Sequence, residues 1–215
     1  MAKIRTQYVC QNCGYNSPRY LGRCPNCGEW NTLVEEQVET SSAPTKKATT
    51  TLTGLVAKPQ KINEINSTET PRVKTKLNEL NRVLGGGIVP GLILIGGDPG
   101  IGKSTLLLQV SGQLSDEHHR VLYVSGEESG TQIKMRAERL KVAGDDFYVY
   151  PETNMDSIRD TIRDLKPEYV VIDSVQTMQA TDVSSAIGSV SQIREVTAQL
   201  MQIAKSNNIT IFVVG

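Results

Sequence analysis

Runs of apolar residues alternate with amphipathic stretches over the last two thirds of the chain. The runs at 169–172 and 209–214 are almost entirely apolar, which is typical of parallel strands covered on both faces. Between the runs, apolar residues recur at the spacing of a helix. The pattern predicts strands at 92–96, 120–125, 147–150, 169–173 and 209–214, and helices at 103–115, 129–141, 155–165 and 189–206. This alternation predicts an α/β fold with an open, mostly parallel sheet, and a ligand at the carboxyl ends of its strands.

The front of the chain follows a different pattern. Residues 40–51 are polar and poor in large apolar side chains, which predicts a mobile linker. Helical spacing at 77–84 stops at three consecutive glycines, Gly85, Gly86 and Gly87. We therefore expect a small N-terminal module at 1–35, a flexible linker at 36–61 and the α/β core at 62–215.

Composition is ordinary for a globular protein, because 38% of the 215 residues are hydrophobic and 21% are charged. No apolar run approaches the roughly 18 residues that a membrane-spanning helix needs, and residues 1–5 lack the apolar stretch of a signal peptide. The sequence therefore predicts a cytoplasmic protein without a membrane partner.

A phosphate-binding loop follows the first predicted strand. The sequence GDPGIGKS at 97–104 matches G-x-x-x-x-G-K-[ST], with the apolar run 92–95 directly before it. Glycines let backbone N–H groups turn towards phosphates, Lys103 can reach the β- and γ-phosphates, and Ser104 can ligate Mg²⁺ at a helix N-terminus. The loop predicts binding of a nucleoside triphosphate. The alternative is a glycine-rich turn without a ligand.

Acidic residues at two strand ends complete a candidate NTPase site. Asp173 ends the apolar run 169–172, which is how such proteins place a carboxylate near Mg²⁺, although an Asp that only caps the next loop would look the same. Glu127 and Glu128 follow the strand at 120–125, and a carboxylate there can orient the attacking water. We expect Glu127, the first acid past the strand, to do so. Glu128 would then only favour the N-terminus of the next helix.

The cysteines form two C-x-x-C pairs separated by ten residues: Cys10, Cys13, Cys24 and Cys27. Four thiolates in this arrangement suit tetrahedral Zn²⁺, which would stabilise a segment too small to have its own core. A redox-active dithiol pair is the alternative. Gly14 and Gly28 follow the pairs, and we expect them to adopt positive φ and to turn their N–H groups towards sulfur. Four aromatic side chains are expected to cover the site: Tyr8, Tyr15, Tyr20 and Trp30.

Charge divides the chain although its net charge is zero. Residues 1–76 carry eleven Lys and Arg against six Asp and Glu, and residues 77–215 carry twelve against seventeen. A basic front on an acidic body suits a polyanionic partner, but solvated lysines in a linker give the same count. Arg5, Arg19 and Arg23, interleaved with aromatic residues, fit contact with nucleic acid as well as docking on protein.

In combination and order, these motifs resemble the bacterial RadA (Sms) family of DNA repair ATPases, within the RecA-like superfamily. The resemblance covers the four-cysteine element and linker, LGGGIVPG at 84–91, GGDPGIGKST at 96–105, VSGEES at 124–129 and VIDSVQT at 171–177. Each motif alone occurs in other RecA-like ATPases, whereas the combination is specific.

The resemblance implies a RecA-like ATPase that forms a hexameric ring, binds single-stranded or branched DNA and moves along it as a motor or helicase. It also implies a role with the RecA recombinase in recombination, repair and, in competent bacteria, transformation. Glu127 matches the catalytic glutamate, Asp173 the Walker B acid, and the four cysteines the zinc ligands. The implied cofactors are ATP or ADP, Mg²⁺ and Zn²⁺. The implied nucleotide and Mg²⁺ positions are Asp173 together with Gly97, Asp98, Pro99, Gly100, Ile101, Gly102, Lys103, Ser104 and Thr105.

The sequence ends at Gly215, where the family continues with a polar sensor residue, a Lys-Asn-Arg-Phe-Gly motif and a Lon-protease-like domain. We therefore expect an N-terminal fragment with weak or no steady-state hydrolysis and impaired ring assembly. Two other functions fit the residues. One is a nucleotide-switched RecA-like signalling ATPase, and the other is a zinc-containing protein-interaction module that does not translocate DNA.

Overall fold

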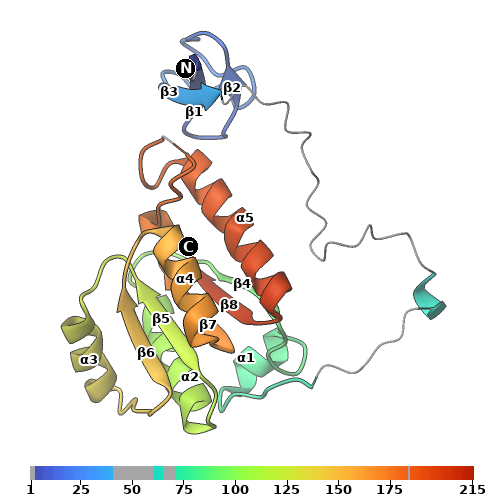
Figure 1. Cartoon of the computed structure of the whole chain (residues 1–215), viewed down its shortest axis with the longest axis vertical. Helices are drawn as coiled ribbons and strands as arrows, with labels where there is room; N and C mark the ends of the chain where they lie inside the picture. The colour runs from blue at the N-terminus through green and yellow to red at the C-terminus, as the bar shows by residue number, and fades with distance from the viewer. Residues whose placement is uncertain (1–2, 41–60, 65–70, 184) are drawn as a thin grey trace.

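The computed structural model describes residues 3–40, 61–64, 71–183 and 185–215, and these residues form two β-sheets (Figure 1). The smaller sheet is antiparallel, in the order β2-β1-β3, and its strands are β1 (Lys3–Cys10), β2 (Asn16–Ser17) and β3 (Leu33–Thr40). The larger sheet is parallel throughout, in the order β4-β8-β7-β5-β6. Its strands are β4 (Gly91–Ile95), β5 (Val121–Ser125), β6 (Phe147–Pro151), β7 (Tyr169–Asp173) and β8 (Thr210–Val214).

Helices alternate with the strands of the larger sheet, as the sequence pattern predicts. They are α1 (Asn78–Val83), α2 (Lys103–Asp116), α3 (Gly130–Arg139), α4 (Met155–Leu165) and α5 (Val190–Asn207), with short 3₁₀ turns η1 (Ile62–Glu64) and η2 (Val175–Thr177). The predicted strands and helices of the core begin and end within two residues of these bounds. The predicted α/β fold with a mostly parallel sheet is confirmed.

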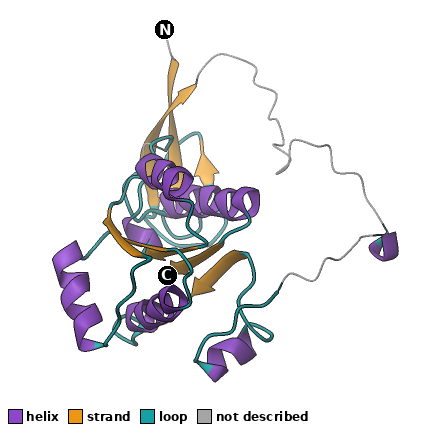
Figure 2. Cartoon of the chain, turned by 60° about the horizontal axis from the view of Figure 1, so that its bottom comes forward, coloured by secondary structure: helices purple, strands orange, loops and turns teal. Residues whose placement is uncertain are grey.

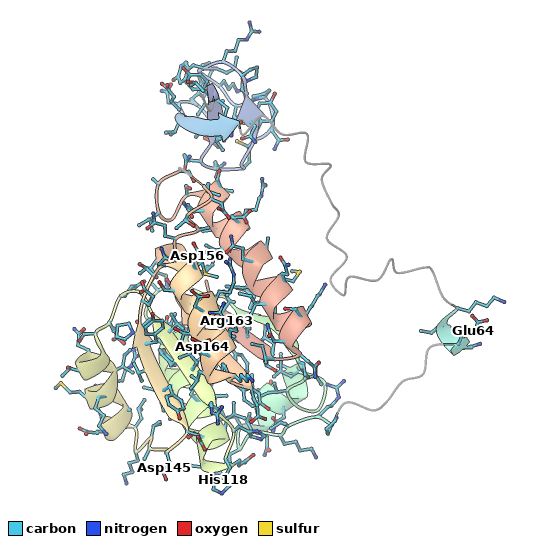
Figure 3. The ribbon with its side chains drawn as sticks, viewed as in Figure 1. Glu64, His118, Asp145, Asp156, Arg163 and Asp164 are labelled. Carbon is cyan, nitrogen blue, oxygen red and sulfur yellow. The ribbon has the colours of Figure 1, made fainter. Side chains whose placement is uncertain are left out.

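Side chains at the helix starts fix where several of these helices begin. Ser129 and Gln132 form a reciprocal capping box at α3, in which each side chain accepts a hydrogen bond from the other residue's backbone N–H. Asn154 caps α4 and Ser189 caps α5 in the simpler one-sided way. Asp156, labelled at the start of α4 in Figure 3, adds a negative charge where the helix dipole favours one.

The core lies on both faces of the larger sheet, which separates two layers of helices (Figure 2). Successive residues of β5 show the division: Leu122 and Val124 pack with α4 and α5, whereas Val121 and Tyr123 pack with α2 and α3. Burial on both faces is why the sequence of such strands is apolar without alternation. Because all five strands run in parallel, their carboxyl ends lie at one edge of the sheet.

The smaller sheet was not anticipated from the sequence. β1 pairs with β3 from Lys3 opposite Thr40 to Cys10 opposite Leu33, so its register depends on residues far apart in the chain. Residues 36–40 of the predicted linker at 36–61 belong to β3, and its residues 41–60 lie outside the described residues. Among the helices that the structure describes, none is long and apolar enough to cross a membrane.

Candidate functional site

The predicted phosphate-binding loop connects β4 to α2 at the carboxyl edge of the sheet. Gly100 and Gly102 have φ of 79° and 101°, a region that only glycine enters readily, and a Cβ at either position would meet no described atom within 4 Å. At these two positions the backbone conformation, and not a lack of space, is what requires glycine.

Lys103, the first residue of α2, lies over this loop. Its Nζ donates hydrogen bonds to the carbonyl oxygens of Gly97 at 2.6 Å and Asp98 at 3.0 Å. Ser104 and Thr105 follow in the first turn of α2, where the helix N-terminus favours an anion. The Lys103 ammonium group thus lies over the loop, close to the N-terminus of α2.

Asp173 lies at the carboxyl end of β7, beside the end of β5. It pairs in register with Ser125, and its carbonyl oxygen accepts a hydrogen bond from Gly126 N at 3.0 Å. Its carboxylate oxygen Oδ2 accepts a hydrogen bond from the hydroxyl of Tyr123 at 2.5 Å. Burial, together with the charge of Asp173, raises the pKa of Tyr123, so this hydroxyl stays protonated as a donor.

The two consecutive glutamates after β5 lie in different environments. Glu128 forms an ion pair with Arg136 of α3 at 2.7 Å, and its backbone N–H donates to Ser125 Oγ at 3.1 Å. Glu127 is exposed, and its Oε1 accepts a hydrogen bond from Ser174 Oγ at 3.1 Å. Glu127 is thereby held beside Asp173 and Ser174, which are joined by a cis peptide bond.

Gly126 brings the turns after β5 and β7 together. A Cβ at this position would clash with the side chain of Thr177 and would lie 3.1 Å from Thr153. Thr177 itself donates a hydrogen bond to the carbonyl oxygen of Ser174 at 2.8 Å. The glycine therefore permits the close approach that places Glu127 next to the end of β7.

The structure brings the four cysteine sulfurs into one cluster, within 4.8 Å of one another. Cys10 and Cys24 are buried, whereas Cys13 and Cys27 are half-buried. Four converging sulfurs are the donor set of a structural zinc site, and they fit the predicted metal.

Hydrogen bonding and burial act differently on these thiols. Burial opposes ionisation of Cys10, but hydrogen bonds with Thr32 and with backbone N–H groups outweigh it and lower its pKa to about 6. Burial raises the pKa of Cys24 to about 11. Zinc binds the thiolate form, so a zinc ion bound here at neutral pH would displace the proton of Cys24.

The predicted role of the two glycines in the zinc module is corrected. Gly14 and Gly28 have positive φ, 71° and 78°, as expected, but their N–H groups donate to the carbonyl oxygens of Cys10 and Cys24, and not to sulfur. These bonds close a tight turn around each cysteine pair, so they shape the site through the backbone.

The aromatic cover of the zinc module is also different from the prediction. Tyr8 packs against the cysteine cluster, and the other large side chains that do so are Leu21 and Leu33. Trp30 is 68% exposed, with the Arg23 guanidinium 5.7 Å from the centre of its ring system, and Tyr20 is 52% exposed. Tyr15 is 37% exposed, and Tyr20 packs edge-on against Tyr8, with ring centroids 5.9 Å apart.

The zinc module contacts the core through α5. Arg194 Nη2 donates a long hydrogen bond, 3.5 Å, to the carbonyl oxygen of Cys13, and its guanidinium lies against Gly14. The sequence offered no signal for this contact, because the two residues are 181 positions apart.

Two residues beside the site were not predicted from the sequence. Tyr123 and Arg136 belong to an apolar strand and an amphipathic helix, where a polar role has no distinct pattern. They are recognised only from their hydrogen bonds. The Tyr123 hydroxyl donates to Asp173, and Arg136 Nη2 donates to the oxygen of that hydroxyl at 3.5 Å.

This fold and site define a P-loop nucleotide-binding domain that carries a four-cysteine metal module. A family model described as "AAA domain" matches residues 58–215, and one described as "Rubredoxin metal binding domain" matches residues 8–35. The chain belongs to the AAA domain family.

Related proteins confirm the resemblance to the RadA family. The chain is 54% identical to the DNA repair protein RadA of Bacillus subtilis (strain 168), over 216 residues that cover the whole chain and 47% of the relative. It is 56% identical to the protein of that name from Listeria monocytogenes, of which it covers 46%, and 51% identical to that from Halalkalibacterium halodurans, of which it covers 47%. The chain thus spans about half the length of these relatives.

Proposed function

We propose that this chain is the ATP-binding part of a DNA repair ATPase that binds single-stranded or branched DNA and moves along it. The observation that carries the proposal is the phosphate loop with Lys103, at the same sheet edge as Asp173 and Glu127. The names of the relatives support the assignment to DNA repair, and from it we infer action with the RecA recombinase in recombination and, in competent bacteria, transformation.

The residues have distinct roles in this proposal. The backbone N–H groups of 97–102, other than Pro99, which has none, and the Lys103 ammonium would bind the β- and γ-phosphates. Thr105 belongs to the same nucleotide-binding set. Ser104 and Asp173 would hold Mg²⁺, which when bound neutralises charge on the phosphates. Glu127 orients the attacking water, and its hydrogen bond from Ser174 restricts the carboxylate to the turn beside Asp173.

The zinc module has a structural role in the proposal. Zinc at Cys10, Cys13, Cys24 and Cys27 would hold a knuckle that leaves Trp30, Tyr20 and Arg23 accessible. We further propose a cytoplasmic location and assembly of the longer protein as a homo-hexamer, since a motor that encircles DNA needs several sites that act in turn.

The ATPase rate of a longer protein, with and without single-stranded DNA, tests this function. We expect stimulation by DNA, and DNA binding that weakens as salt rises because Lys and Arg displace counterions from phosphates. Lys103→Ala is the matched control, and it should weaken nucleotide binding and, with it, hydrolysis. ATP hydrolysis without any DNA stimulation or salt-dependent DNA binding would favour a nucleotide-switched signalling ATPase.

A further inference from the structure

Tyr123 lies behind the candidate site, in the middle of β5, with none of its surface exposed. Its ring packs edge-on against Phe147, with centroids 6.2 Å apart. Its hydroxyl reaches the neighbouring strand and donates to Asp173 Oδ2 at 2.5 Å. A buried tyrosine hydroxyl needs a partner, and an ionised carboxylate is among the strongest available. One of the two carboxylate oxygens of Asp173 is therefore held by a buried hydroxyl from the neighbouring strand.

Arg136 of α3 extends this contact into a network. Its Nη2 donates to the Tyr123 hydroxyl oxygen at 3.5 Å and forms an ion pair with Glu128 Oε2 at 2.7 Å. The Arg136 side chain is only 17% exposed, and its Nε has no hydrogen-bond partner among the described residues. A cation beside the tyrosine oxygen makes the O–H a stronger donor towards Asp173. The network thus links the turn that carries Glu127 and Glu128 to the end of β7.

Fixing one oxygen has a direct consequence for metal binding. The terminal torsion of an Asp side chain is broad, so an unpartnered carboxylate samples many orientations. We propose that Tyr123 is a positioning residue, whose hydroxyl fixes the Asp173 carboxylate and leaves its second oxygen for the Mg²⁺ that accompanies the nucleotide. This inference rests on the proposed nucleotide-binding function. A purely structural hydroxyl would stabilise the fold without changing how Mg²⁺ affects nucleotide binding.

The affinity of the 215-residue chain for a fluorescent ATP analogue distinguishes these two roles. It is measured once with EDTA and once with saturating Mg²⁺, and the ratio gives the gain in affinity due to the metal. Tyr123→Phe should reduce this gain about tenfold, the scale of one hydrogen bond to a charged group, and should leave the metal-free affinity unchanged.

Tyr169→Phe is the matched control. It removes the same hydroxyl from the start of β7, at the opposite end of that strand from Asp173, and should leave the gain unchanged. Asp173→Asn should remove most of the gain. Adding Tyr123→Phe to Asp173→Asn should then have no further effect, because both changes act through one carboxylate.

The outcomes separate this inference from the proposed function. A full gain in Tyr123→Phe, with the gain lost in Asp173→Asn, overturns the positioning role and leaves nucleotide binding intact. If the unaltered chain binds no nucleotide, both the inference and the proposed function are overturned. If it binds nucleotide but gains no affinity with Mg²⁺, the inference alone is overturned. If thermal unfolding shows that Tyr123→Phe does not fold, a crystal structure of the unaltered chain with Mg²⁺ and a non-hydrolysable ATP analogue decides. Retention of the Tyr123–Asp173 hydrogen bond supports the role, and its loss overturns it.

Discussion

At the scale of single residues, neighbouring groups of identical chemistry differ through their partners. Glu127 and Glu128 both follow β5, but Glu128 is ion-paired with Arg136 at 2.7 Å, whereas Glu127 is exposed and accepts a hydrogen bond from the Ser174 hydroxyl. The Glu128 oxygen that faces the Arg136 guanidinium is already engaged, so it is less available to a water molecule. The environment therefore favours Glu127 as the residue that orients water, which the sequence could propose only from its position.

Glu127→Gln tests this assignment in the longer protein. The amide keeps the size of the side chain and loses its charge, so ATP should still bind while hydrolysis falls by about 100-fold or more, the range for a lost general base. The measurement is steady-state ATPase activity alongside nucleotide affinity. Glu128→Gln is the comparison, and it should reduce hydrolysis far less. Normal turnover by Glu127→Gln would place the water-orienting role on another residue.

At the scale of elements, the strands and helices whose burial imposes a local pattern on the sequence could be predicted, and the contacts between distant residues could not. The strands and helices of the core were predicted within two residues because two-sided burial imposes continuous apolar runs on the sequence. The phosphate loop and the strand-end acids were predicted because their chemistry requires a fixed local spacing. β1 and β3, by contrast, pair through positions such as Cys10 and Leu33, and Tyr123 meets Asp173 across 50 residues. Contacts of this kind depend on tertiary packing, which leaves no local pattern.

The segment between β7 and α5 depends on one buried amide. Gln192 has no exposed surface, and its Oε1 accepts from Ala180 N at 2.9 Å while its Nε2 donates to the carbonyl oxygens of Val183 at 2.8 Å and Ser185 at 3.2 Å. Gln192→Leu should lower the free energy of unfolding by about 1–3 kcal/mol, because it leaves these buried groups unpaired. Urea unfolding measures the change. Gln202→Leu, at an exposed position of the same helix, should stay within about 0.5 kcal/mol of the unaltered chain, and equal effects of the two would contradict this account.

The zinc module depends on its metal for stability. Among the described side chains, its apolar cluster consists of the four cysteines with Tyr8, Leu21 and Leu33, a small core for a three-stranded sheet. Cys27→Ala should therefore reduce bound zinc from one ion per chain to none and remove amide protection in β1 and β3. The thermal transition of the α/β core should not move. Elemental analysis and hydrogen exchange measure the two effects, and unchanged zinc content would refute the assignment of the ligands.

At the scale of the whole molecule, α5 contacts both the zinc module and the segment between β7 and α5, and its N-terminal end lies next to the smaller sheet (Figure 1). Arg194 contacts Cys13 and Gly14 of the module, and Gln192, on the same helix, bonds to Ala180 of that segment. Among the residues that the structure describes, one long hydrogen bond of 3.5 Å joins the module to α5. A single bond of this kind stabilises the docked arrangement by no more than about 1 kcal/mol, so we expect docking to be reversible.

Arg194→Ala should shift this equilibrium towards a free module. Because about 1 kcal/mol corresponds to a roughly fivefold change in population, the module should tumble faster while the core tumbles as before. ¹⁵N relaxation of amides in β1 and in β5 measures both rates in one sample. Arg163→Ala is the matched control. Arg163, labelled on α4 in Figure 3, is exposed, and it forms an ion pair with Asp160.

Gly14→Ala should act like Arg194→Ala, since a Cβ at position 14 would lie 2.8 Å from the Arg194 guanidinium, in addition to the strain of the positive φ of Gly14. A module that already tumbles independently in the unaltered, zinc-loaded chain would show that the Arg194 contact does not hold in solution.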